Sequence, residues 1–175
     1  MHYATIKWND IANGEGVRIS LFVSGCTHRC KNCFNEIAWD FSYGEPFDEN
    51  VQNKILEGLN SPYISGLSLL GGEPLEPQNQ EALFPFVQEV KKRFPDKKIW
   101  CYTGFVYDEE TGELKEKHKN TPYTKSLIAL FDILVDGPFI EELKDIRLKF
   151  RGSSNQRVID VQRSLKNKTC VLYLQ

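Results

Sequence analysis

The sequence lacks a long apolar run, so no segment of it is expected to span a membrane. Its first ten residues, MHYATIKWND, also lack the basic flank and apolar stretch of a secretion signal. We therefore expect a cytoplasmic protein with no membrane partner. The chain has 175 residues, of which 41% are hydrophobic and 26% are charged, and this profile is typical of one soluble globular domain.

A strong excess of charge of either sign is missing as well. The 22 Lys and Arg residues nearly balance the 24 Asp and Glu residues, which leaves a formal net charge of -2. The chain therefore generates no large field that would draw it to nucleic acid or anionic lipid. We expect no nucleic-acid partner, and any protein partner must be recognised by a local surface.

Histidine is scarce, and the sequence shows neither a hydrolase triad nor a disulfide framework. The three histidines, His2, His28 and His118, are too scattered to indicate a general-base site. The five cysteines are odd in number, and three of them are close together in GCTHRCKNC. This arrangement suits metal or redox chemistry better than disulfide staples.

Strand and helix signals alternate along the chain, which predicts an α/β fold with a mostly parallel sheet and right-handed crossovers. Short apolar runs, most of which end at glycine, predict the strands, and amphipathic segments predict the helices between them. The expected strands cover residues 17–25, 66–72, 97–104, 132–139 and 169–175, and the expected helices cover residues 47–60, 79–94 and 125–131.

Three segments carry more detailed predictions. Asp48 is the expected N-cap of the first helix, whose apolar stripe consists of Val51, Ile55, Leu56 and Leu59. Pro85 predicts that the second helix begins late or is kinked. Residues 107–124 are polar and charged, which predicts a solvated, mobile excursion or a poorly packed helix.

Polar and glycine-rich stretches stand at the carboxyl ends of the expected strands. In parallel sheets, ligands gather at this edge. Four such stretches, GCTHRCKNC, GGEP, CYTG and DGPF, follow successive strands. We therefore expect all four to converge on one site.

The cysteine loop, in which Cys26, Cys30 and Cys33 follow a C-x3-C-x2-C spacing, is open to three interpretations. A structural zinc site needs four ligands, and His28 would complete a Cys3His set in a strained loop. A redox pair of Cys30 and Cys33 would leave Cys26 without a role. A [4Fe-4S] cluster usually takes four thiolates, so three would leave one iron open to a small molecule.

A fourth thiolate would have to come from one of two distant cysteines. Cys101 lies in an expected strand, and Cys170 lies in the apolar stretch TCVLYL. Both are interpreted more simply as small buried residues. The iron that three cysteines leave without a protein ligand would then define the function of the site.

CTHRCKNC resembles the cysteine signature of radical S-adenosylmethionine (SAM) enzymes, and GGEP resembles their motif for the methionine amino group. The stretches NGEGVRISLFVSGC, GGEPLEPQN, IWCYTGF, ILVDGPF and RGSSNQRVID are similar to the anaerobic ribonucleoside-triphosphate reductase-activating proteins, over roughly residues 3 to 160. The resemblance implies a small open or partial (βα) barrel. It implies a single radical SAM domain over residues 1–175, with a core at about 14–140 and a C-terminal extension at about 141–175.

The resemblance also implies roles for individual residues, with no catalytic residue beyond the cluster ligands. Cys26, Cys30 and Cys33 would hold a [4Fe-4S] cluster whose fourth iron is chelated by the amino and carboxylate groups of SAM. The residues implied to contact SAM are Asn32, Cys33 and Phe34 at the adenosyl portion and Gly71, Gly72 and Glu73 at the methionine portion. Asp136, an acid at a strand end, is a further candidate that would bind the ribose or merely end the strand.

The implied activity is that of an activase. It would cleave SAM reductively and use the 5'-deoxyadenosyl radical to create a glycyl radical on the large anaerobic ribonucleoside-triphosphate reductase. The implied partners are that reductase and an external one-electron reductant such as a flavodoxin. Alternatives are an activase of another glycyl-radical enzyme, a small radical SAM enzyme acting on a free metabolite, and, in a different class, a Cys3His zinc-binding interaction module.

Overall fold

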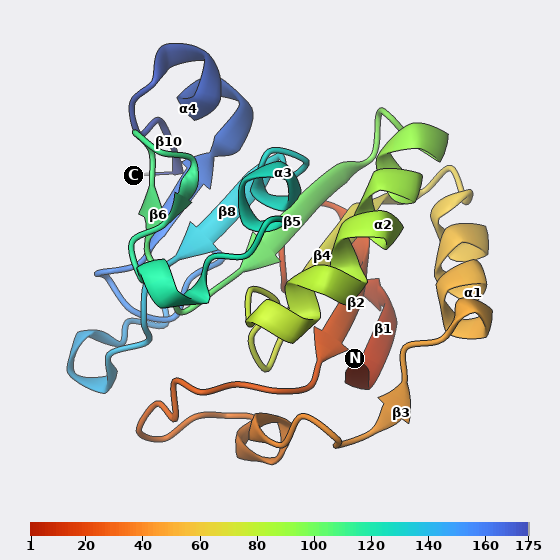
Figure 1. The fold of residues 1–175 in the computed structure, drawn as a ribbon, viewed down its shortest axis with the longest axis horizontal. Helices are drawn as coiled ribbons and strands as arrows, with labels where there is room; N and C mark the ends of the chain where they lie inside the picture. The colour runs from red at the N-terminus through yellow and green to blue at the C-terminus, as the bar shows by residue number, and fades with distance from the viewer. Residues whose placement is uncertain (175) are drawn as a thin grey trace.

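One open sheet extends across the molecule (Figure 1). The computed structural model describes residues 1–174. Its sheet has eight strands in the order β10-β9-β8-β5-β4-β2-β1-β3, so that β3 and β10 form the two edges. The strands are β1 (His2–Asp10), β2 (Val17–Val23), β3 (Glu45–Pro46), β4 (Ile64–Gly71), β5 (Lys98–Tyr102), β8 (Ile133–Asp136), β9 (Arg157–Asp160) and β10 (Leu172–Leu174).

Parallel pairing is confined to the centre of this sheet. Strands β2, β4, β5 and β8 pair in parallel, as the alternation of strand and helix signals predicts. The outer strands add only antiparallel pairs, so the sheet as a whole is mixed. Connectivity explains the difference, because a parallel neighbour needs a crossover whereas β1 returns to β2 through the short link of residues 11–16.

Three helices lie on one face of the sheet: α1 (Glu49–Leu59), α2 (Pro77–Arg93) and α3 (Thr124–Ile128) (Figure 1). The main apolar core fills the space between these helices and the strands. A fourth helix, α4 (Val161–Asn167), follows β9 and packs against the same core through Val161. Within residues 1–174, no helix is both long enough and apolar enough to cross a membrane.

The first helix matches its prediction, and the second departs from it. The Asp48 side chain caps α1 by accepting a hydrogen bond from the Val51 N–H at 3.0 Å, and the predicted stripe of Val51, Ile55, Leu56 and Leu59 is buried. Helix α2 begins at Pro77, so the expectation that Pro85 delays its start is wrong. A proline in the first helical turn costs no hydrogen bond, which explains the early start.

Residues 107–124 fold back as a small hairpin. Strand β6 (Tyr107–Asp108) pairs with β7 (Glu113–Leu114), and the 3-10 helix η2 (Lys117–Lys119) follows. The side chains of Tyr107 and Leu114 are completely buried in the main core. The prediction of a poorly packed helix is therefore wrong, because two apolar anchors fasten the stretch as a hairpin. Its charged side chains are exposed or half-buried, in agreement with the alternative of a solvated excursion.

The segment between β8 and β9 covers part of the opposite face of the sheet. It contains the 3-10 helix η3 (Glu141–Leu143). Near its end, the Phe150 ring packs edge-on against Trp100 of β5, with 5.1 Å between ring centroids. This contact holds the segment close to the carboxyl ends of the parallel strands.

Candidate functional site

The carboxyl ends of the four parallel strands border one cavity of about 520 Å³. The cysteine loop follows β2, residues 71–73 end β4, residues 102–104 end β5, and Gly137 follows β8, and all of these segments line the cavity. The predicted convergence of the four stretches is therefore confirmed. Further lining residues come from the segment between β8 and β9, among them Phe139, Lys144, Leu148, Phe150, Arg151 and Gly152.

Three of the five cysteines reach this cavity. Cys26, Cys30 and Cys33 all line it as free thiols. Cys101 is completely buried in the main core, and Cys170 is partly buried against that core. The cavity therefore receives the three thiols of the loop and neither of the distant ones.

Backbone hydrogen bonds hold the two halves of the cysteine loop differently. The N–H groups of Gly25 and Cys26 donate to carbonyl oxygens of the 3-10 helix η1 (Glu36–Trp39) at 2.8 and 3.3 Å. Between Cys30 and Cys33 the chain makes a local turn, closed by the Cys33 N–H donating to the Cys30 carbonyl oxygen at 3.2 Å. The first half of the loop is thus hydrogen-bonded to η1, whereas the second half is closed by a hydrogen bond within the loop.

Two of the thiols at the cavity, those of Cys26 and Cys30, are held in their neutral form. Burial raises the pKa of the Cys26 thiol to about 12. Burial, together with the nearby Cys33 thiol, also raises the pKa of Cys30. A bound metal cation reverses this preference because it stabilises the thiolate and releases the proton.

The three thiols can be compared with the ligand sets of a single metal ion and of a cluster. Within residues 1–174, no three His, Cys, Asp or Glu side chains gather closely enough to hold one metal ion. A zinc site needs its sulfur ligands at about 2.3 Å from one ion. A [4Fe-4S] cluster binds each thiolate to a different iron, so its ligands surround a larger group. Three thiols arranged around one cavity therefore fit the donor set of a cluster.

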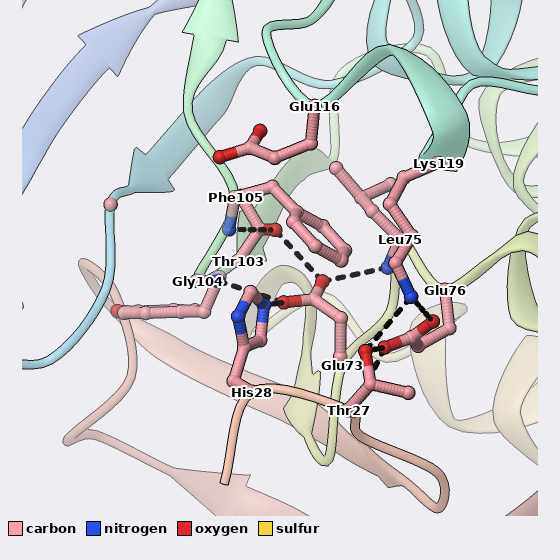
Figure 2. Close-up of polar contacts among 12 residues, drawn as sticks. Thr27, His28, Glu73, Leu75, Glu76, Thr103, Gly104, Phe105, Glu116 and Lys119 are labelled. Carbon is pink, nitrogen blue, oxygen red and sulfur yellow. Dashed lines mark hydrogen bonds and ion pairs between the residues drawn. The ribbon is translucent and has the colours of Figure 1, made fainter. Parts of the chain in front are cut away.

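Glu73 joins three walls of the cavity (Figure 2). Its carboxylate accepts hydrogen bonds from the Leu75 N–H at 2.8 Å, the Thr103 hydroxyl at 2.8 Å and the Gly104 N–H at 2.7 Å. His28 Nε2 lies 2.8 Å from the same carboxylate, so this ring nitrogen faces Glu73. A carboxylate accepts about four hydrogen bonds, so these protein groups occupy its acceptor positions.

Two glycines allow the end of β4 to meet its neighbours. Gly71 has φ +110°, and a Cβ there would lie 2.7 Å from backbone atoms of Phe22. A Cβ on Gly72 would lie 2.6 Å from the Gly25 carbonyl oxygen and 2.9 Å from that of Ala38. Gly72 therefore permits close contact between β4 and the cysteine loop, in addition to lining the cavity.

A second cluster of polar side chains, centred on Glu76, lies beside the cluster around Glu73 (Figure 2). Glu76 is buried, and its carboxylate accepts hydrogen bonds from the Thr27 N–H at 2.9 Å and from Lys119 Nζ at 2.8 Å. Burial acts to raise the pKa of Glu76, but the hydrogen bonds from Lys119 and Thr27 outweigh it and lower that pKa. The carboxylate is therefore held in its charged form next to the cysteine loop.

Comparison with known proteins agrees with this donor set. A family model described as a 4Fe-4S single cluster domain matches residues 12–159, a range that includes all three loop cysteines. Anaerobic ribonucleoside-triphosphate reductase-activating proteins are similar over most of the chain. The Haemophilus influenzae protein is 46% identical over 158 residues, which are 89% of this chain and 96% of the relative. The chain belongs to the family of anaerobic ribonucleoside-triphosphate reductase-activating proteins.

Two more members of the family show how far this similarity extends. The Escherichia coli K12 protein is 40% identical over 160 residues, which are 90% of this chain and 97% of the relative. The protein of Enterobacteria phage T4 is 37% identical over 158 residues, which are 90% of this chain and 93% of the relative. The similarity therefore spans nearly the whole length of these relatives.

The remaining residues expected to contact a ligand in this family lie in different surroundings. Asn32 and Phe34 line the cavity, and the Phe34 side chain is 83% exposed at its rim. Asp136 is buried and is not among the lining residues. Its carboxylate accepts hydrogen bonds from the Arg157 guanidinium and from the Tyr107 N–H at 2.8 Å. The structure thus gives Asp136 an ion pair in place of a cavity position.

Sequence reasoning did not single out Thr27, Glu76, Thr103 or Lys119. Thr27 lies inside CTHRCKNC, and Glu76 lies inside GGEPLEPQN, so their position in these motifs was an available signal. Lys119 had no such signal, because it belongs to a charged stretch that contains two other lysines.

Proposed function

We propose that this chain is a radical SAM activase that generates a glycyl radical on anaerobic ribonucleoside-triphosphate reductase. The names of its relatives supply the reductase as the target, and the match to a 4Fe-4S domain supplies the metal group. The mixed open sheet would then serve as a partial barrel of the radical SAM type, within a single domain. A cytoplasmic location and a flavodoxin-like electron donor belong to the same proposal.

The observation that carries the proposal is the arrangement of three thiols, and no fourth, around one cavity. Cys26, Cys30 and Cys33 would hold the cluster, which leaves one iron for the amino and carboxylate groups of SAM. The cluster would then supply one electron to the sulfonium of SAM, so that methionine leaves and the 5'-deoxyadenosyl radical takes a hydrogen atom from a glycine Cα of the reductase.

The chain itself would bind SAM and orient it. Gly71 and Gly72 would present their backbone groups to the methionine portion, and their lack of a Cβ lets the end of β4 pack against β2 and the cysteine loop. Glu73 would act on that portion indirectly, because its carboxylate accepts hydrogen bonds from Leu75, Thr103 and Gly104 and so holds the surrounding segments in place. Asn32, Cys33 and Phe34 would contact the adenosyl portion, with the exposed ring of Phe34 available for stacking. Asp136 would act indirectly, by fixing Gly137 at the cavity wall.

The proposal is tested with anaerobically prepared protein, SAM, dithionite and the reductase. We expect iron and sulfide in near-equal amounts, 5'-deoxyadenosine as a product, and a glycyl-radical signal in the electron paramagnetic resonance spectrum. One zinc per chain with no visible absorption band would overturn the cluster assignment. A cluster that cleaves SAM without producing a radical on the reductase would instead leave the activase of another glycyl-radical enzyme as the function.

A further inference from the structure

Thr27, Glu76 and Lys119 form a closed triangle of polar contacts (Figure 2). Lys119 Nζ donates to the Thr27 hydroxyl oxygen at 2.8 Å and to Glu76 Oε2 at 2.8 Å. The Thr27 hydroxyl donates to Glu76 Oε1, and the Thr27 N–H donates to the same oxygen at 2.9 Å. Each of the three residues therefore contacts both of the others, which fixes the backbone of Thr27 directly after Cys26.

The backbone of Lys119 is held in place by a buried side chain of α2. Gln80 of α2 is completely buried and donates from Nε2 to the Lys119 carbonyl oxygen at 3.0 Å. Its Oε1 accepts hydrogen bonds from the hydroxyl groups of Thr121 and Thr124. Since α2 also presents Glu76 at its N-terminal end, one helix holds both the cation and the anion of the triangle.

Phe105 adds an apolar support between the two polar groups of the site. Lys119 Nζ lies 5.5 Å from the centroid of the Phe105 ring, and the His28 ring lies 4.3 Å from it. Lys119 therefore contacts the side chain of Thr27 and shares Phe105 with His28, the next residue of the cysteine loop. Lys119 is therefore linked to two successive residues of the loop, directly to Thr27 and through Phe105 to His28.

We propose that Lys119 and Glu76 are positioning residues that hold Cys26 where it can ligate the cluster. This inference rests on the proposed function, because it takes Cys26 as a ligand. Residues outside the ligand shell that orient ligands commonly contribute strongly to metal affinity. Here the hairpin segment that carries Lys119 supplies that support from a part of the chain 92 residues away from Thr27.

Removal of the ammonium group would leave a buried carboxylate without its cation. Glu76 is 2% exposed, so it would have to draw in water or move, and Thr27 would move with it. The fold as a whole is supported elsewhere, since the main core does not include any of the three residues. We therefore expect cluster retention to suffer more than folding.

The test compares Lys119→Met with Lys119→Arg and with Lys117→Met in the full-length protein. Lys117 is in the same 3-10 helix, but it is exposed and pairs with Asp108 and Glu113. We expect Lys119→Met to lose iron to a chelator about tenfold faster than the parent, which corresponds to the loss of one charge-assisted hydrogen bond. Lys119→Arg should restore most of the retention, and Lys117→Met should match the parent.

Two further measurements keep the test decisive. With SAM added, the electron paramagnetic resonance spectrum of the reduced cluster should differ from that of the parent in Lys119→Met and should match that of the parent in Lys117→Met. Thr27→Val, a change at an exposed loop residue, should accelerate iron loss in the same direction even if Lys119→Met folds poorly. Parent-like retention in Thr27→Val and in folded Lys119→Met would overturn the inference. A parent protein that binds no cluster would instead overturn the proposed function.

Discussion

Gly72 approaches the cysteine loop so closely that a Cβ on this residue would lie 2.6 Å from the carbonyl oxygen of Gly25. The contact is reinforced by two backbone hydrogen bonds, from the Gly72 N–H to the Val23 carbonyl oxygen at 2.7 Å and from the Glu73 N–H to the Gly25 carbonyl oxygen at 2.8 Å. The end of β4 and the start of the cysteine loop therefore behave as one unit. A change at Gly72 acts on the loop as well as on the cavity.

Gly72→Ala is expected to push the cysteine loop away from β4. The overlap is with backbone atoms, which have little freedom to yield, so we expect a loss of about tenfold in SAM affinity and a lower iron content. Iron analysis and a SAM titration under nitrogen measure both effects. Gly58→Ala in α1 is the matched control, because a Cβ there meets only side-chain atoms of Ile19 and Trp8. Unchanged SAM affinity in Gly72→Ala would contradict this account.

Cys30→Ala is expected to abolish cluster assembly while leaving the fold intact. Cys30 is a partly exposed loop residue outside the main core, so its replacement removes a ligand without opening a core cavity. Iron and sulfide content, with far-ultraviolet circular dichroism for the fold, measure the two outcomes. Cys170→Ala is the control and should assemble the cluster normally, since Cys170 does not line the cavity. A full cluster in Cys30→Ala would show that the ligand assignment is wrong.

The centre of the fold was predictable because its strands are buried on both faces. In β2, six of the seven residues are buried, and the strand is marked in the sequence by apolar residues that only Arg18 and Ser20 interrupt. Strand β1 gave no such signal, because its residues are mostly exposed or half-buried and their polarity is mixed. Strand β9 is only four residues long and follows a polar loop. Both outer strands depend on a neighbour that the local sequence does not reveal.

The site was predictable to the extent that its chemistry lies in contiguous motifs. The spacing of Cys26, Cys30 and Cys33 and the strand-end glycines identified one cavity that the structure assembles. The contact of Lys119 with Thr27 joins residues 92 positions apart, and no local pattern encodes it. The ion pair of Asp136 was missed for the same reason, because Arg157 follows a long loop after β8.

Arg157→Met is expected to destabilise the protein by about 3 kcal/mol, because it leaves the buried Asp136 carboxylate without a cation. Arg157 Nε donates to Asp136 Oδ1 at 2.9 Å, and Nη2 donates to Oδ2. Urea unfolding of the metal-free protein measures the change. Arg157→Lys keeps the charge but loses the two-pronged contact, so an intermediate loss is expected. A change in Arg157→Met of less than about 0.5 kcal/mol would mean that the pair is not structurally important.

Asp10 is expected to make stability depend on pH in the acid range. Burial acts to raise its pKa, but hydrogen bonds from Asn13 Nδ2 at 2.6 Å and from the Ala12 N–H at 2.9 Å help to lower that pKa overall. A carboxyl whose pKa is lowered by folding contributes stability that is present above its unfolded pKa and is lost as the pH falls through its folded pKa. The contribution of Asp10 should therefore be complete at neutral pH and decline below about pH 4.

Asp10→Asn isolates this contribution, because the amide keeps the shape of the side chain and does not titrate in this range. Urea unfolding of the metal-free parent and variant should show the parent to be more stable at pH 7. The difference should shrink as the pH falls below about 4, since protonation of Asp10 removes the charge that the two donors stabilise. A constant difference between parent and variant across this range would show that the carboxylate charge of Asp10 does not stabilise the link between β1 and β2.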